Sequence, residues 1–397
     1  MQASPYGTSV KGFRDGAVPR FVRMDVLLLL AAVALIATSI YTIASATKGD
    51  IPGDPNFFVY RQTAYAVVGL VLMLVLSRID YSRFRDWKAG LYVAMIGLIL
   101  LTFALGSVAR GSRRAVDLGF FQLQTSEPGK VLLILTLSAF MVDRVRRLGE
   151  RETTSRIVLL ALVPAMLVVA QPDLGSGLVY LAIVTAVLFV AGTKWTHFAG
   201  LAGLGVIAVV VVLVAAPALG LELLKPYQMD RLTAFVNPTE NLSGQGYQQA
   251  QSLVAIGAGG KTGRGEAATQ TKLDFLPEHH TDFIFSVIGE EFGFMGAALV
   301  LSLFALLIWR CLRILTMSKN LYGSLIAGGI TAMLMFQIFV NVGMTIGIMP
   351  ITGVTLPLMS YGGSSVIVTF MALGLLQSIH AQARETALAK GSNTALL

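Results

Sequence analysis

Charged side chains are scarce in this chain: Asp, Glu, Lys and Arg make up 13% of its 397 residues, whereas 55% are hydrophobic. Water-soluble globular domains carry about 25% charged residues, so most of this surface is not built to face water. Cysteine is scarcer still, and the single Cys311 excludes an internal disulfide. The net charge of +8 follows from the membrane topology described below and gives no indication of nucleic-acid binding.

Long apolar runs take up much of the chain. A helix that crosses a bilayer core of about 30 Å needs about 20 mainly apolar residues. The runs that reach or approach this length are 25–46, 62–77, 89–107, 131–143, 157–171, 174–192, 199–220, 283–309, 323–347 and 363–380. We therefore expect an all-α polytopic membrane protein with about ten transmembrane helices.

The distribution of Lys and Arg predicts how these helices are oriented. Nineteen of the thirty basic residues fall in the tails and in one alternate set of loops, and short loops rich in Lys and Arg stay in the cytoplasm. Both termini are then cytoplasmic, and we expect a tail 1–23, a membrane domain 24–380 and a tail 381–397. The long polar segment 221–282 becomes an extracytoplasmic loop between helices seven and eight, and a loop of that length is expected to contain short helices.

A group of basic residues breaks this topology rule. Arg110, Arg113, Arg114 and Lys130 lie in or next to the short outer loop 108–130. One interpretation is that the loop forms its own salt bridges and contacts lipid phosphates. The other is that its cations bind an anionic substrate group such as a diphosphate, because a guanidinium group can hold two phosphate oxygens at once.

The segment 275–285, with the sequence FLPEHHTDFIF, contains the strongest candidate for chemistry. Asp282 is followed directly by apolar residues, and a partly desolvated carboxylate gains proton affinity, which suits a general base. The plainer alternative is a carboxylate at a helix start, where the helix dipole favours it. Pro277 suits the first turn of a helix, and a helix that begins there places Glu278 and Asp282 on one face.

The two histidines in this segment raise the question of a metal. His279 and His280 stand next to Glu278 and Asp282, but consecutive residues of a helix diverge by about 100°, so both imidazoles cannot reach one ion from a regular helix. We therefore predict no zinc site. A divalent cation, Mg²⁺ or Mn²⁺, held by carboxylates and substrate phosphates stays open, and no other cofactor is predicted.

Further polar and small residues lie in or near the apolar runs. Glu290 and Glu291 are adjacent carboxylates inside such a run, where they are either functional or paired structurally. The glycine-rich segment 257–265 lacks the context of a P-loop, and we expect a tight turn that lets the backbone approach a lipid head group. Ser364 and Ser365 follow two glycines, an arrangement that allows close helix or lipid approach or places hydroxyls along a pathway.

Several motifs carry a family resemblance. They are Gln171–Gly175, Gly246–Gln248 with Ala255–Gly257, Leu276–Glu278, His280–Phe285 with Gly289–Glu291, Asn341–Gly343, and Leu356–Leu358 with 360–365. In these motifs, and over nearly all of residues 25–385, the chain resembles the SEDS proteins (shape, elongation, division, sporulation). Within that family it is most similar to the RodA-type branch.

The resemblance implies a peptidoglycan glycosyltransferase. Such proteins polymerise lipid II into glycan strands on the outer face of the bacterial cytoplasmic membrane during cell elongation. They work with a class B penicillin-binding protein, other membrane proteins of the elongation complex and the surrounding lipids. The key acidic residue of the family corresponds to Asp282. The expected substrate-binding residues are Arg110, Arg114, Glu127, Lys130, Glu278, His280, Ser364 and Ser365.

Two positions depart from the family pattern. Ala115 stands where the family usually has Trp, and Thr125 stands where it has Pro. Stacking of a Trp on a sugar or polyprenyl group therefore cannot be assumed, and the outer loop is expected to be more mobile.

The hypothesis for catalysis is that Asp282 takes the proton of the acceptor's sugar 4-hydroxyl, while Arg110, Arg114 and Lys130 stabilise the diphosphate leaving group. A flippase for the lipid-linked precursor is the alternative, and it needs charged groups along a full transmembrane path. A non-catalytic scaffold would leave Asp282 replaceable. A division paralogue of the FtsW type shares most of the motifs, and the sequence does not identify the partner, the metal requirement or the glycan length.

Overall fold

The computed structural model describes residues 24–389 except 49, 110–111, 118, 120, 148, 221–227, 230, 232, 234, 236–244, 273–274 and 277–278, and for 107–109, 112–114, 245, 266, 271–272 and 388–389 it describes the backbone alone. The predicted tail 1–23 and the last part of the tail 381–397 thus lie outside the described residues.

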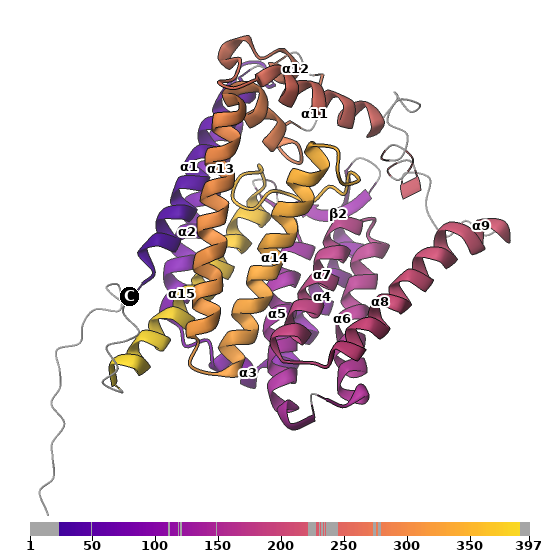
Figure 1. The fold of residues 1–397 in the computed structure, drawn as a ribbon. Helices are drawn as coiled ribbons and strands as arrows, with labels where there is room; N and C mark the ends of the chain where they lie inside the picture. Colours follow the sequence, from indigo (N-terminus) through magenta and orange to yellow (C-terminus); the bar gives the residue numbers. More distant parts are fainter. Residues whose placement is uncertain are drawn as a thin grey trace, which may run out of the picture.

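The described chain is mainly helical (Figure 1). Its longer helices are α1 (Val26–Ala46), α2 (Phe57–Arg78), α4 (Lys88–Leu105), α5 (Ser126–Asp143), α6 (Arg151–Ala170), α7 (Leu174–Val190), α8 (Trp195–Val210), α11 (Gln245–Gly259), α13 (Ile284–Met317), α14 (Leu321–Thr345) and α15 (Gly363–Ala389). The shorter helical segments are α3 (Arg83–Asp86), η2 (Val145–Arg147), η3 (Val211–Ala215), α9 (Ala216–Ala218), η4 (Gly265–Ala267) and α12 (Thr269–Lys272). The strands β1 (Ser107–Ala109), β2 (Ser112–Asp117) and β3 (Gln122–Gln124) form a small antiparallel sheet.

The helices match the predicted membrane-spanning runs. Within the described residues, eight helical segments are long and apolar enough to cross a membrane, and α7 is a shorter apolar helix of 17 residues. α5 has 18 residues but carries Glu127, Lys130 and Asp143. Each predicted run coincides with one of these segments. The all-α polytopic membrane fold is therefore confirmed.

The helices differ sharply in burial. α15 packs along α2 and lies inside the bundle, with 89% of its apolar window buried. α14 packs against α13 and α7. The segment from α8 to α9 extends away from the bundle in Figure 1, and none of its apolar window is buried. An apolar helix surface that is not covered by protein is expected to contact lipid in a membrane.

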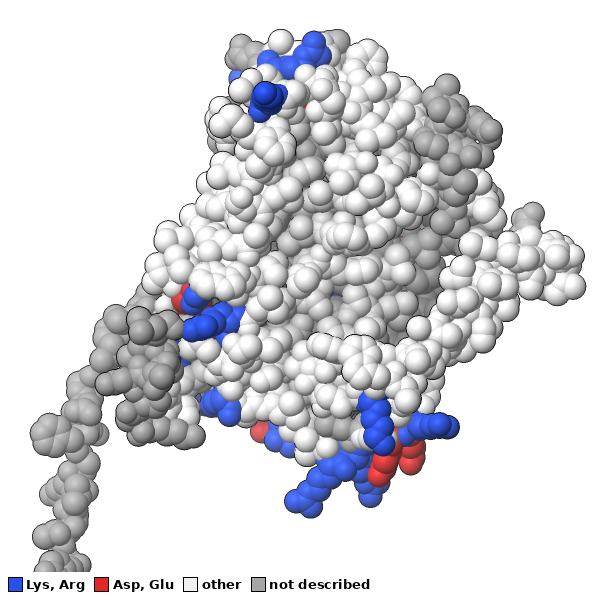
Figure 2. Space-filling model, viewed as in Figure 1, with Lys and Arg blue, Asp and Glu red and all other residues white. Residues whose placement is uncertain are grey.

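The bundle has two ends with different surfaces. We call the end that holds α3, η2 and the α13–α14 connection the α3 end, and the end that holds α11 and α12 the α11 end (Figure 1). Lys and Arg side chains gather at the α3 end in the face shown in Figure 2, a smaller group lies at the α11 end, and the surface between them is almost free of charge. An uncharged belt between two charged ends is the surface expected of a protein that spans a bilayer.

A break in α13 shapes the α11 end. Gly293 inside this helix has φ 63° and ψ −159°, which is not helical. The backbone N–H of Phe294 donates to the Gly260 carbonyl at 2.9 Å instead of to its own helix. A β-carbon at Gly293 would lie 2.3 Å from the Gly263 nitrogen, and one at Gly263 would lie 2.1 Å from the Glu291 carbonyl oxygen. Only glycines allow the two backbones to approach this closely.

The glycine-rich segment 257–265 contains the tight turn that was predicted, and its approach to a lipid head group stays a prediction. It forms the end of α11 and the turn after it, and its backbone approaches α13. The presence of α11, η4 and α12 within 221–282 agrees with the expectation that this long loop contains short helices.

Candidate active site

The turn 279–283, which we call the Asp282 turn, lies at the α11 end directly before α13. The helix begins at Ile284 and not at Pro277, so the predicted helix start was wrong; Pro277 and Glu278 lie outside the described residues. The reason is that the carbonyl groups of the turn have partners elsewhere. The His280 carbonyl accepts a hydrogen bond from the Tyr361 nitrogen (2.9 Å), and the Thr281 carbonyl accepts one from Ser360 Oγ (2.6 Å). The Asp282 carbonyl accepts one from Asn341 Nδ2 (2.8 Å).

The apolar neighbours of Asp282 anchor this turn. Phe283 is 1% exposed and packs in a small apolar cluster with Leu276, Met344 and Ile351. Phe285 is 4% exposed and belongs to the main core. Both rings are therefore held by packing, and the backbone between His280 and Phe283 is fixed by three hydrogen bonds and two apolar anchors.

The Asp282 carboxylate is half-buried beside a glycine and an arginine. A β-carbon at Gly353 would lie 3.5 Å from Asp282 Oδ2 and 3.9 Å from Arg231 Nη2. Arg231 Nη1 also donates to the Thr352 carbonyl at 3.2 Å. Carboxylate and guanidinium thus flank the same point, and Gly353, with φ 73°, leaves it free of a side chain. The sequence analysis placed Arg231 in the outer loop 221–282 but did not select it as a candidate site residue.

A second polar group lies at the start of α5. Lys130 Nζ is 2.6 Å from Glu127 Oε1, and the two side chains are 2% and 5% exposed. Two charges removed from water need close pairing, because each alone would be costly to bury. The interpretation that the outer loop forms its own ion pairs thus holds for Lys130, but the pair lies in the interior and not at a lipid surface. Arg110 lies outside the described residues, and Arg114 is described only as backbone of β2.

A buried carboxylate that the sequence analysis did not select joins this group. Asp173 Oδ2 accepts hydrogen bonds from Ser126 Oγ (3.0 Å) and Gln124 Nε2 (3.1 Å), and its Oδ1 accepts one from the Ser176 nitrogen (3.0 Å). We call Gln124, Ser126, Glu127, Lys130 and Asp173 the Lys130 cluster. The signal was present in the motif 171–175, which was used only for the family resemblance.

The two predicted serines connect the sheet to the loop before α15. Ser364 Oγ donates to the Gln122 carbonyl at 2.8 Å and accepts from the Gln124 nitrogen at 3.0 Å. Ser365 Oγ lies 3.0 Å from Thr355 Oγ1. Both hydroxyls are thus engaged within the protein, where they position β3 and the segment 346–362.

The Lys130 cluster and the Asp282 turn meet through that same segment. Gly175, in the first turn of α7 beside Asp173, is so close that a β-carbon there would lie 2.8 Å from the Thr352 carbonyl oxygen. The next residue, Gly353, faces Asp282. The structure therefore brings Lys130, Glu127 and Asp282 to one region at the α11 side of the bundle, linked by 352–353.

His280 faces an aromatic group at the edge of this region. Its ring centroid lies 4.7 Å from that of Phe58 and 5.7 Å from that of Tyr361. Burial raises the pKa of Tyr361 to about 12, so its hydroxyl stays protonated and can donate a hydrogen bond at neutral pH.

The two deep carboxylates have structural partners. Glu290 Oε1 accepts from the backbone nitrogens of Thr269 and Gln270 at 2.8 and 2.9 Å, and Glu291 Oε1 accepts from Ser45 Oγ at 2.8 Å. These bonds hold α12 and the end of α1 against α13, which agrees with the structural alternative considered for this pair.

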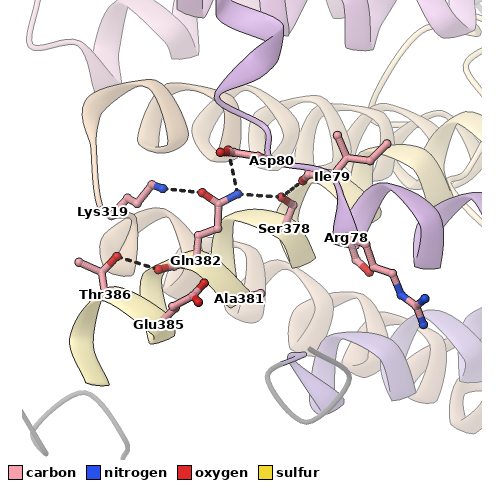
Figure 3. A pocket seen from close by; sticks show the side chains of 10 residues that line it. Arg78, Ile79, Asp80, Lys319, Ser378, Ala381, Gln382, Glu385 and Thr386 are labelled. Atoms are coloured by element: carbon pink, nitrogen blue, oxygen red, sulfur yellow. Dashed lines mark hydrogen bonds between the residues drawn. The ribbon is translucent and has the colours of Figure 1, made fainter. Parts of the chain in front are cut away.

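The cavity in Figure 3 is separate from this region. It has a volume of about 370 Å³ and is lined by residues that include Arg78, Asp80, Lys319 and Gln382. Lys319 follows the end of α13, whereas Asp282 precedes its start. The cavity is thus a whole helix length away, at the α3 end, and is not part of the candidate active site.

Comparisons with known proteins agree with the fold. A sequence model of the FTSW_RODA_SPOVE family, described as "Cell cycle protein", matches residues 22–385. The chain is 38% identical over 362 residues to the peptidoglycan glycosyltransferase MrdB of Escherichia coli K12, covering 90% of this chain and 94% of MrdB. It is 36% identical over 366 residues to the stage V sporulation protein E of Bacillus subtilis, covering 91% and 98%.

A solved structure is similar as well. Its title is "Structural coordination of polymerization and crosslinking by a peptidoglycan synthase complex", and it matches with a TM-score of 0.76 and 33% identity over 91% of this chain and 98% of the other.

Proposed function

Because the chain belongs to the FtsW/RodA/SpoVE family, we propose that it is a peptidoglycan glycosyltransferase that polymerises lipid II. Its relatives carry that activity in their names, and the protein is a multi-pass bacterial membrane protein. The observation that carries the proposal is the Asp282 turn, which holds a carboxylate next to Arg231 and opposite a glycine. This arrangement offers a base, a cation and room for a substrate at one place.

Asp282 acts as the general base in this proposal. The oxygen of the acceptor's sugar 4-hydroxyl attacks the anomeric carbon of the donor and forms the new glycosidic bond. The bond from that carbon to the diphosphate oxygen breaks, and the hydroxyl proton passes to the Asp282 carboxylate. The three hydrogen bonds to the turn hold the carboxylate in place before reaction, which lowers the cost of reaching the reactive geometry.

Cations near the turn stabilise the leaving group. Negative charge develops on the polyprenyl diphosphate as the bond breaks, and preorganised positive charge in a site with little water is effective there. Arg231 is suitably placed within the described residues, and Lys130, with Arg110 and Arg114 from the same outer loop, supplies further charge. Glu127 holds the Lys130 ammonium in a defined position until substrate binds.

The site faces outward in this proposal. The gathering of Lys and Arg at the α3 end supports a cytoplasmic position for that end, which puts Asp282 on the outer face of the cytoplasmic membrane.

A labelling experiment tests this orientation. A Cys311→Ser protein with Asn56→Cys, at the exposed N-cap of α2, should react with an impermeant maleimide in intact spheroplasts. Reaction only after lysis would reverse the orientation.

The activity is tested with purified lipid II and the purified protein, with product separated by gel electrophoresis. Asp282→Asn keeps the shape of the side chain but removes its basic function, and a lost general base costs about 10²–10⁴-fold in rate. Unfolding temperatures of both proteins in detergent show whether the variant is intact. A wild-type rate in a stable Asn variant would exclude Asp282 as the base.

A flippase is less well supported than an enzyme. Glu290 and Glu291, the adjacent carboxylates inside an apolar run, bond to backbone nitrogens and to Ser45 within the protein. The same preparation, reconstituted in vesicles with lipid II in the inner leaflet, distinguishes the two functions. Translocation without polymer would favour the flippase.

The cellular role is proposed to be elongation, with a class B penicillin-binding protein as partner. The segment Ile79–Tyr81 and the His-Thr-Asp form of the turn resemble the RodA-type branch, and a similar structure is named as a synthase complex. Depletion of the protein should give rounded cells. Filamentous cells would assign it to division, and a defect confined to spores would assign it to sporulation.

A further inference from the structure

Two imidazoles and a carboxylate converge at the α11 end of the bundle. Asp50 belongs to the connection between α1 and α2, and His279 and His280 belong to the Asp282 turn. One ligand atom from each lies within 4.8 Å of the others. His279 Nε2 is 3.3 Å from Asp50 Oδ2, and His280 Nδ1 is 3.9 Å from the same oxygen. We propose that these three side chains bind a divalent transition-metal ion of the Zn²⁺ class.

The backbone of the turn makes this convergence possible. In a helix, neighbouring side chains diverge by about 100°, and on that ground the sequence predicted no zinc site. Residues 279–283 form a turn and not a helix, because their carbonyl groups bond to Ser360, Tyr361 and Asn341. The two imidazole centroids then lie 5.0 Å apart, and both rings reach Asp50.

The tautomer of His279 points to a cation. Its Nδ1 lies 2.9 Å from the Leu276 carbonyl oxygen, which can only accept, so Nδ1 carries the proton. In the neutral ring, Nε2 then has no proton, and its lone pair faces the Asp50 carboxylate. Two acceptors at 3.3 Å repel unless a positive charge lies between them. His279 is 1% exposed, and within the described residues its Nε2 has no hydrogen-bond partner.

The same geometry is that of a metal-binding histidine. Such a residue usually donates its second ring N–H to a carbonyl or carboxylate, which fixes the ring and leaves the other nitrogen to the metal. With bonds of about 2.0–2.1 Å, ligand atoms of a tetrahedral ion lie roughly 3.3–3.5 Å apart. The His279–Asp50 distance already matches that value, and the His280–Asp50 distance requires a shift of only a few tenths of an ångström.

The donor set selects the kind of ion. Two imidazole nitrogens and one carboxylate oxygen suit Zn²⁺, and less strongly Mn²⁺, whereas Mg²⁺ and Ca²⁺ prefer oxygen ligands. Three protein ligands leave a fourth position for water or for an oxygen of another molecule. The bound ion would tie the α1–α2 connection to the turn that carries Asp282. The proposal concerns binding alone and does not depend on glycosyl transfer.

The test measures metal binding by the full-length protein in detergent, without lipid II. After treatment with a chelator and removal of the chelator, we expect about one Zn²⁺ per chain by titration calorimetry and by elemental analysis. His279→Gln and Asp50→Asn should each weaken Zn²⁺ binding by at least about 10–100-fold. Asp54→Asn, in the same connection but exposed, and His197→Gln, which removes an imidazole bonded to Thr154, should bind as wild type.

A spectroscopic measurement on the wild-type protein tests the proposal even if the variants fail to fold. The X-ray absorption spectrum of the Zn²⁺-loaded protein should show two imidazole ligands. Binding with this signature, lost in both site variants and kept in both controls, supports the proposal. Absence of Zn²⁺ binding by the wild type, a spectrum without imidazole, or unchanged binding by His279→Gln and Asp50→Asn would each overturn it.

Discussion

Lys130 Nζ lies 2.6 Å from Glu127 Oε1 in the first turn of α5, and both side chains are almost completely shielded from solvent. A pair of this kind combines two roles that mutation can separate. Each charge stabilises the other in the interior, and the same ammonium is proposed to bind the diphosphate. A loss of activity on removal of Lys130 alone is therefore ambiguous.

A double substitution resolves the ambiguity. Lys130→Ala leaves the Glu127 charge buried without its partner, and breaking a buried ion pair costs about 3–5 kcal/mol, so the unfolding temperature should fall clearly. Glu127→Gln with Lys130→Met removes both charges at nearly constant volume and should restore stability. Polymerisation should stay low in the double variant, because the cation is gone. Wild-type turnover in that protein would make the pair purely structural.

Gly353 offers a test of the space in front of Asp282. Alanine there should occupy the space in front of the carboxylate that a substrate would use, since its β-carbon would lie in van der Waals contact with Asp282 Oδ2, at 3.5 Å. A displacement of about 1 Å at a reactive group can lower turnover up to about 100-fold. Gly53→Ala is a matched control, because Gly53 has a similar φ of 89° but no neighbour within 4 Å of an added β-carbon.

Both glycine variants carry the same backbone strain of about 1–2 kcal/mol, so both should unfold at somewhat lower temperature. Only Gly353→Ala should also lower the rate of lipid II polymerisation. Equal rates in the two variants would mean that substrate does not approach Asp282 from the side of Gly353.

Asp80 at the α3 end gives a pH-dependent prediction. Burial by itself would raise the pKa of its carboxyl group, but hydrogen bonds from Ser82 and Gln382 and the charge of Lys319 outweigh burial and lower the pKa below 3.8. Figure 3 shows the Gln382 amide between Asp80 and Lys319. A depressed folded-state pKa stabilises the fold above the unfolded-state pKa, and this stabilisation disappears as the pH falls through the lower value.

The Asp80→Asn protein should thus unfold at a lower temperature than wild type at neutral pH. The difference should shrink as the pH drops below 3.8, when both proteins carry a neutral group at this position. Unfolding temperatures measured from neutral pH to acid, with exposed Asp54→Asn as control, provide the check. A difference that grows toward acid pH would contradict the assignment.

Activation by a partner is a further expectation of the proposed function. The Asp282 turn is held by hydrogen bonds from Ser360 and Tyr361 and directly precedes α13, which packs against α11 and α12. A protein that docks on the α11 end can therefore bias the position of these segments. A coupling of about 1–3 kcal/mol changes activity about 5–150-fold. We expect low polymerisation by the chain alone and clear stimulation by its class B penicillin-binding protein, even when the transpeptidase serine of that partner is mutated. Equal rates at saturating lipid II would refute activation without refuting the enzyme.

The membrane fold was predictable from sequence because apolar length alone decides it. Each predicted run became a helix, even in α5, where Lys130 and Glu127 interrupt the apolar pattern. The helix start before Asp282 was not predictable, since it depends on tertiary partners: Ser360 and Asn341 hold carbonyl groups that a helix would otherwise have used.

Part of the candidate site was predictable from the sequence, and part depended on tertiary contacts. Asp282 stands out as a carboxylate beside apolar residues and Lys130 as a cation that breaks the topology rule, whereas Glu127 was selected through the family resemblance; the structure brings the three to one region. Asp173 and Arg231 did not stand out, because their importance comes from neighbours far away in the sequence, Ser126 for one and Thr352 for the other. Local pattern does not contain such contacts.

The glycines at the break in α13 also limit how this protein can evolve. A β-carbon at Gly293 would meet the backbone of residues 261–263, and a β-carbon at Gly263 would meet the backbone of Glu291 and Phe292. When two bulky residues clash, a second mutation can shrink the partner and restore the fit. Here the obstacle at both positions is backbone, which a smaller side chain cannot remove, so a substitution at one glycine has no compensating change at the other. Genetic screens for suppressors of Gly263→Ala should recover changes elsewhere in α11 or α13, or reversion, and none at Gly293.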